Sequence, residues 1–240
     1  MKTLIGLGFI VLTIIFFALL LMRFRPALSA KAFRNTIIAL VAWTIFLGAW
    51  SISGMAMRFD LFPVNMAPVL IIPFVAIVII TIKAKDVLAR IPLRSLVHLQ
   101  IFRVFVEILL WALFVENLLP VQMTFEGRNW DILSGLTAPL AAIFLVRSKW
   151  ALAAWNVATL GLLINIVTVA ILSMPSPLRS FFNEPANDIV AKFPFILLPG
   201  MLVPLAYGLS FLSLRQIFSL TSQNEETVTS PSHRGSVQHN

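Results

Sequence analysis

The stretch Thr3–Met22, TLIGLGFIVLTIIFFALLLM, contains no charged residue and is followed at once by Arg23 and Arg25. A helix needs about 20 apolar residues to cross the hydrocarbon core of a bilayer. The run is also longer than the apolar core of a cleavable signal peptide, which has about 7–15 residues. We therefore expect an uncleaved membrane-spanning helix with its basic flank in the cytoplasm.

The composition of the whole chain agrees with a lipid environment. Of the 240 residues, 59% are hydrophobic and 12% are charged, whereas soluble domains carry about 25% charged residues. The mean hydropathy is +0.94. The net charge is +8, but the basic residues lie in short loops between apolar runs, where anionic lipid headgroups rather than nucleic acid are the expected partners.

The sequence offers little for metal or cofactor binding. It has no cysteine, which excludes disulfides, thiol nucleophiles and cysteine metal sites. Two of the three histidines, His233 and His239, lie in the polar C-terminal region, apart from His98. We expect no metal site and no cofactor.

Seven apolar segments predict an all-α, polytopic transmembrane bundle of about seven helices. Their expected ranges are Thr3–Met22, Thr36–Ala56, Ala67–Ile82, Val97–Leu119, Asp131–Val146, Trp150–Met174 and Phe193–Ile217. The third and fifth are short for a crossing, which usually takes about 17–25 residues. Residues 1–220 form a single transmembrane domain in this interpretation, and the polar residues 221–240 form a disordered cytoplasmic tail.

The distribution of Lys and Arg predicts the orientation. Twelve of them flank the apolar segments on one side and five on the other, with Arg103 inside a helix left out. Because Lys and Arg are enriched in cytoplasmic loops, the bias places the N-terminus outside and the C-terminus in the cytoplasm. The short loops are typical of the inner membrane of a bacterium.

The fourth apolar segment contains the charged residues that decide where to look for function. Gln100, Arg103 and Glu107 are spaced i, i+3, i+7 and share one helix face. A charge at the bilayer centre costs from ~2.5 to more than 10 kcal/mol. Two interpretations are open: Arg103 and Glu107 form a structural i, i+4 pair, or they line the path of a substrate or ion.

A second polar stretch precedes the fifth segment, and it contains Glu126, Arg128, Asn129 and Asp131. Asn129 or Asp131 is suited to capping the following helix. Alternatively, Glu126, Arg128 and Asp131 line the mouth of a cavity on the outer side, where Arg128 recognises an anionic group.

These residues leave several functions open. The leading hypothesis is a permease or channel-like protein for a small solute or ion, with a polar cavity around the fourth helix. One alternative is a membrane-embedded enzyme acting on a lipid or isoprenoid, with Glu107, Glu116, Glu126 and Asp131 as candidate acids and bases. Another is a non-catalytic assembly partner or sensor. No nucleotide-binding or zinc-protease motif is present, and catalytic activity is not decided.

Overall fold

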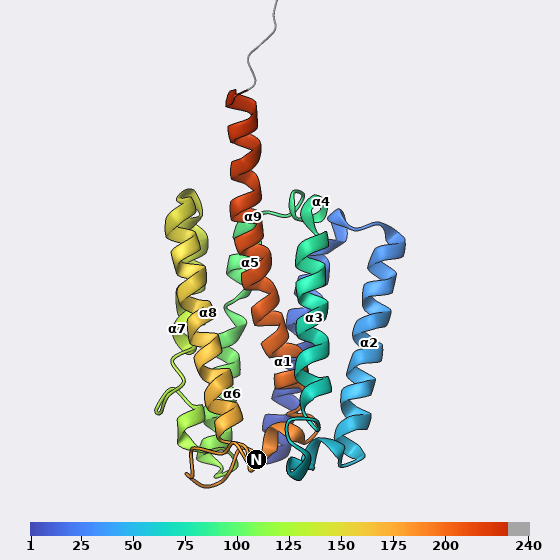
Figure 1. Cartoon of the computed structure of the whole chain (residues 1–240), viewed down its shortest axis with the longest axis vertical. Coiled ribbons are helices and arrows are strands. Elements are labelled where there is room, and N and C mark those ends of the chain that lie inside the picture. Colours follow the sequence, from blue (N-terminus) through green and yellow to red (C-terminus); the bar gives the residue numbers. More distant parts are fainter. Residues whose placement is uncertain (230–240) are drawn as a thin grey trace, which may run out of the picture.

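The computed structural model describes residues 1–229, with side chains as far as residue 219. The described residues form helices and no strand. The helices run alternately up and down in one bundle (Figure 1). Their bounds are α1 Lys2–Phe24, α2 Ala30–Ile52, α3 Ala67–Lys83, α4 Lys85–Leu88, α5 Leu93–Leu99, α6 Phe102–Val115, α7 Ile132–Phe144, α8 Lys149–Leu172 and α9 Val203–Thr229. Short 3₁₀ segments are η1 Arg25–Ala27, η2 Met55–Met57, η3 Phe59–Leu61, η4 Val121–Met123, η5 Leu145–Arg147 and η6 Ile189–Ala191, and η7 Leu198–Leu202 is a π-helix.

Five helical stretches are long and apolar enough to cross a membrane. They are Lys2–Ala27, Ala30–Ile52, Leu93–Val115, Lys149–Leu172 and Leu198–Ser219. Two apolar stretches are shorter, Ala67–Lys83 and Ile132–Arg147, and they correspond to the two segments that the sequence predicts to be short. Large apolar side chains such as Ile14, Ile45 and Ile80 are exposed on the outside of the bundle. The all-helical, membrane-associated character expected from the sequence is therefore supported.

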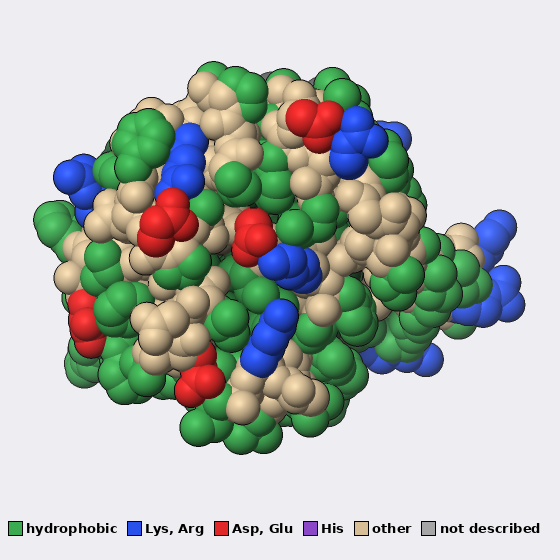
Figure 2. Space-filling model, turned by 90° about the horizontal axis from the view of Figure 1, so that it is seen from below, with side chains coloured by type: hydrophobic (Ala, Val, Ile, Leu, Met, Phe, Trp, Pro, Cys, Tyr) green, Lys and Arg blue, Asp and Glu red, His purple; other side chains and the backbone are tan. Residues whose placement is uncertain are grey.

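The two ends of the bundle differ in charge. At the upper end in Figure 1, which we call the basic end, Asp86 is the one acidic side chain described, and Lys and Arg crowd the helix termini and loops. Its basic residues are Arg23, Arg25, Lys31, Arg34, Lys83, Lys85, Arg90, Arg94, Arg147, Lys149 and Arg215. The opposite, mixed end carries both signs (Figure 2), including the ion pairs Arg58–Asp60, Arg179–Glu184 and Lys192–Asp188.

The π-helix η7 and α9 lie at the centre of the bundle, where α9 packs against α3, α5 and α8. Pro204 has no N–H, so the α-helical donor for the carbonyl of Gly200 is missing. The indole Nε1 of Trp43 on α2 donates to that carbonyl instead, at 2.8 Å. A Cβ on Gly200 would lie 2.6 Å from a methyl of Leu47, the one fully buried residue of α2. The irregular backbone of η7 is thus stabilised by α2, which lies at the edge of the bundle (Figure 1).

Several boundaries differ from those expected; α2, for example, spans Ala30–Ile52 rather than Thr36–Ala56. The segment expected at Val97–Leu119 begins at Leu93 and ends at Val115, with a tightened turn at Gln100 and Ile101, whose N–H groups bond three residues back. At the other end of the chain, α9 continues to Thr229, past the boundary at 220 where the polar tail was expected to begin. The rest of that expected tail, 230–240, lies outside the described residues.

Candidate functional site

A buried ion pair joins α6 to the start of α7. The Nε of Arg103 donates to Oδ2 of Asp131 at 2.8 Å, and Nη2 lies 2.8 Å from Oδ1. The side chains are only 2% and 6% exposed. Such a two-point contact satisfies the planar guanidinium far better than a single bond, because two parallel N–H groups meet two oxygens.

The pair forms because the chain folds back after α6. Arg103 lies twelve residues before the end of α6 at Val115, which is ~18 Å along the helix axis. Residues 116–130 return this distance largely without regular structure, so that α7 begins at Ile132 deep within the bundle. Asn117 starts the return with a φ of 55°, and Asn165 on α8 donates to the carbonyl of Arg128 at 2.8 Å.

Asp131 lies directly before α7, where the positive end of the helix dipole stabilises a carboxylate. The hydroxyl of Ser134 donates to its Oδ1 at 3.0 Å. The sequence also suggested this residue as a helix cap, but its side chain bonds no backbone N–H of α7; Asn129 instead accepts a hydrogen bond from the Asp131 N–H at 3.1 Å.

Glu107 is buried, with 2% of its surface exposed, and it has a different partner from the one predicted. The Nδ2 of Asn129 donates to its Oε2 at 2.5 Å and to the carbonyl of Met123 at 3.0 Å. Among the described residues, Arg103 makes its ion pair with Asp131 and Glu107 makes none. The predicted intrahelical pair of Arg103 and Glu107 is therefore wrong, because Asp131 offers both carboxylate oxygens to Arg103 from the folded-back chain.

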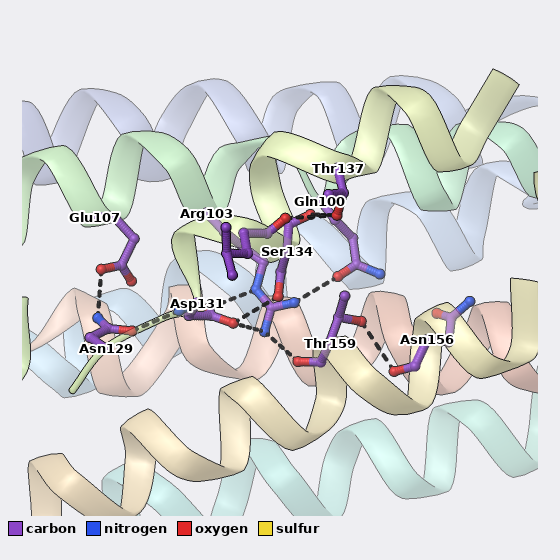
Figure 3. A network of polar contacts seen from close by, with 10 residues as sticks. Gln100, Arg103, Glu107, Asn129, Asp131, Ser134, Thr137, Asn156 and Thr159 are labelled. Carbon is purple, nitrogen blue, oxygen red and sulfur yellow. Dashed lines mark hydrogen bonds and ion pairs between the residues drawn. The ribbon is translucent and has the colours of Figure 1, made fainter. Parts of the chain in front are cut away.

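Two further groups complete the surroundings of Arg103. Its Nη1 donates to Oε1 of Gln100 at 3.1 Å, and its Nη2 donates to the carbonyl of Thr159 on α8 at 3.2 Å. Figure 3 shows Glu107, Asn129, Asp131, Arg103 and Thr159 in a row along the bundle. Sequence reasoning missed Thr159, since a backbone carbonyl acceptor leaves no signal in the residue type.

A small cavity lies beside this row. It has about 70 Å³ of volume open to the centre of a water molecule. Glu107 and Asp131 are the two charged residues that border it, the other lining residues are apolar, and nearly all of the cavity surface is apolar. The π-helix contributes Leu198 and Pro199 to the opposite wall. The cavity thus lies between a carboxyl-bearing helix and the most irregular backbone of the bundle.

The other residues predicted for the site lie nearer the surface. Glu126 is exposed and accepts a hydrogen bond from the Trp111 indole at 2.6 Å. Arg128 is exposed, with its guanidinium 4.9 Å from the ring centroid of Phe181. Neither lines the cavity. Of the seven predicted residues, the structure gathers Gln100, Arg103, Glu107, Asn129 and Asp131, and it leaves Glu126 and Arg128 at the mixed end.

Comparison with known proteins identifies a family for most of this structure. Residues 61–218 match the family model described as "Domain of unknown function (DUF8737)". The chain belongs to this family. The matched region contains every residue of the buried row and cavity, whereas α1 and α2 precede it. No curated protein and no solved structure matches the chain.

Proposed function

We propose that the chain crosses the inner membrane of a bacterium seven times, with its basic end in the cytoplasm and its N-terminus outside. The contrast between the basic and mixed ends supports this orientation. α3 and the stretch Ile132–Arg147 would be the short crossings. The irregular residues 116–130, which Asn165 of α8 bonds at the carbonyl of Arg128, would span the remaining thickness of the bilayer in the fifth crossing.

We propose further that the protein is a permease or channel-like protein, with its ion site at Glu107. The observation that carries this proposal is a buried carboxyl group without a cationic partner on the wall of a cavity. A purely structural acid at this depth would be expected to have a cationic partner, because an uncompensated charge costs several kcal/mol. Acidic side chains in this situation are typical of proton relays in pumps and transporters.

The cavity favours a proton or a very small solute over other ligands. Ca²⁺ and Mg²⁺ take about six or more oxygen ligands, and the walls offer only Glu107 and Asp131, the latter already bonded to Arg103 and Ser134. A cavity of about 70 Å³ is far smaller than the ~300–1,000 Å³ of pockets for larger ligands.

The alternative hypothesis, an enzyme acting on a lipid or isoprenoid, is supported only by the apolar walls of the cavity. Such a reaction needs an acid and a base that both reach the reacting atoms of the substrate. Glu116 is half-buried and Glu126 is exposed, both near the mixed end, whereas Glu107 and Asp131 line the cavity. Glu116 and Glu126 therefore lie apart from the cavity, and of the two acids that line it, Asp131 is already bonded to Arg103 and Ser134, which disfavours an acid and base reaction there.

The test is proton flux into liposomes that contain the purified protein and an enclosed pH-sensitive dye. We expect Glu107→Gln to reduce flux to the level of protein-free liposomes, because the amide cannot exchange a proton. Glu126→Gln is the matched control, since Glu126 is a carboxyl group bonded to an indole at the surface. Equal flux through both variants and the unaltered protein would remove Glu107 from the mechanism.

A further inference from the structure

A second set of buried polar side chains continues from Arg103 toward the basic end. It lies where α5, α8 and α9 pack together. Asn156 comes from α8, and Ser210, Ser213 and Gln216 follow one another on α9 at intervals of three residues. Asn156, Ser210 and Ser213 are 0% exposed and Gln216 is 5% exposed. Polar side chains at this spacing form a stripe along one side of a helix.

Hydrogen bonds connect this set to the ion pair. The carbonyl of Thr159 accepts from Arg103, and the Thr159 hydroxyl donates to the carbonyl of Asn156 at 3.1 Å. Figure 3 shows Asn156 beyond Thr159 in the same direction as the row from Glu107 to Arg103. The Nδ2 of Asn156 then donates to the hydroxyl of Ser213 at 3.2 Å.

The far end of the set reaches the loop at the basic end. The Nε2 of Gln216 donates to the carbonyls of Leu88 and Ile91 at 2.9 Å and 2.6 Å. Leu88 is the last residue of α4 and Ile91 lies in the loop that joins α4 to α5. Polar groups therefore extend from the centre of the bundle to its basic end.

Four atoms along this route are buried and have no hydrogen-bond partner. They are Nε2 of Gln100, Oδ1 of Asn156, Oγ of Ser210 and Oε1 of Gln216. Each such atom costs ~1–3 kcal/mol when it is left unsatisfied. Buried polar groups in proteins are usually satisfied by ordered water when no side chain or backbone group is in reach. Of the nine such atoms among the residues with described side chains, these four lie along one route.

We propose that a file of water molecules occupies the α5–α8–α9 interface and connects the Arg103–Asp131 pair with the aqueous phase at the basic end. Gln100, Asn156, Ser210 and Gln216 are its hydrogen-bonding lining. The cavity at Glu107 lies on the other side of the ion pair, so Arg103 separates two hydrated compartments. The paired side chains of Arg103 and Asp131 lie between the file and this cavity. That this file delivers protons to the site is the part that rests on the proposed function.

The absence of cysteine from the chain permits a direct test of hydration with single cysteines. Ser210→Cys and Ser213→Cys place a thiol of nearly the same size on the proposed file. Ala142→Cys is the matched control, because Ala142 is also small and 0% exposed but lies in an apolar contact of α7 with Leu152 and Ala153. Size-exclusion chromatography selects variants that fold.

The probe is Ag⁺ in chloride-free buffer, added to membrane vesicles of either orientation. After quenching, the protein is unfolded in SDS, and thiols that Ag⁺ did not reach are counted by the gel shift with a polyethylene glycol maleimide. We expect Ag⁺ on the side of the basic end to protect the cysteines at 210 and 213 and to leave the one at 142 reactive. Cysteines at 210 and 213 that stay as reactive as that at 142, or that are protected only from the mixed end, would overturn the proposal.

The labelling experiment tests the water file, and the flux measurement tests the proposed function independently of it. Protection at 210 and 213, together with unchanged flux through Glu107→Gln, would keep the water file and remove the proposed function. Loss of flux in Glu107→Gln without protection at either position would keep Glu107 as the site and remove this path.

Discussion

The buried pair of Arg103 and Asp131 predicts a large and specific coupling between two substitutions. Asp131→Asn keeps the shape of the side chain but leaves Arg103 charged and buried, with 2% of its side chain exposed. Removing one partner of a buried ion pair costs about 3–5 kcal/mol. Arg103→Met removes the guanidinium and leaves Asp131 as an uncompensated carboxylate, so we expect a cost in the same range.

The double variant should be less unstable than these two costs together imply. It lacks both charges of the pair, and the main loss is the hydrogen bonds that Arg103 donated to Gln100 and to the carbonyl of Thr159, at about 1 kcal/mol each. We therefore expect a coupling free energy of at least about 3 kcal/mol between the two substitutions.

The assay is reversible unfolding in mixed micelles by titration with SDS, followed by tryptophan fluorescence. The control is Asp60→Asn in the exposed pair with Arg58, where both side chains are more than half exposed, and it should leave the free energy of unfolding unchanged. Strict additivity of Arg103→Met and Asp131→Asn would refute the buried pair as the structure has it.

Other predictions concern helix packing, and the same titration measures them. Gly135→Ala should lower the free energy of unfolding by about 1–3 kcal/mol, because its Cβ would lie 2.6 Å from the backbone nitrogen of Val104. Gly161→Ala should raise the free energy of unfolding by about 0.5–1 kcal/mol, because a Cβ at Gly161 would meet open space. A Gly135→Ala variant that is more stable than Gly161→Ala would contradict the packing of α7 on α6. Trp43→Phe should lower the free energy of unfolding by about 1–3 kcal/mol and speed hydrogen exchange in the π-helix, because it leaves the carbonyl of Gly200 without its donor. Unchanged hydrogen exchange in the π-helix would contradict the stabilising role of α2.

The apolar segments were predictable because their signal is local. A run such as Thr3–Met22 cannot be hidden in a soluble fold of this size, and the helices lie close to the ranges that composition predicts. The two short segments were also recognised, since length alone decides whether a helix reaches across a bilayer.

The partner of Arg103 was not predictable from spacing. An interval of four residues favours the pair Arg103 and Glu107, but the partner lies 28 residues away. The irregular return of residues 116–130 brings Asp131 to this depth, and such backbone has no periodicity that a sequence pattern reveals. The signal that was available is composition: Arg103, Glu107 and Asp131 are charged residues at or beside long apolar runs, and each must find a buried partner or a cavity.

The mouth of a cavity on the outer side was predicted from the density of polar residues between Gln122 and Asp131. Density does not say which side chains point inward. Asn129 and Asp131 are buried, whereas Glu126 and Arg128 are exposed, because exposed and buried side chains alternate from Arg128 to Asp131 after the turn at Gly127. That turn is tight enough that a Cβ on Gly127 would contact the carbonyl oxygen of Val121.

Glu107, buried without a cationic partner beside a small cavity, is the residue that we propose to exchange protons across the membrane. The most direct measurement is the ratio of proton flux through Glu107→Gln to flux through Glu126→Gln, at equal protein per liposome. Our account predicts a ratio near zero, with Glu126→Gln equal to the unaltered protein. A ratio near one, in variants that elute and unfold like the unaltered protein, would contradict it.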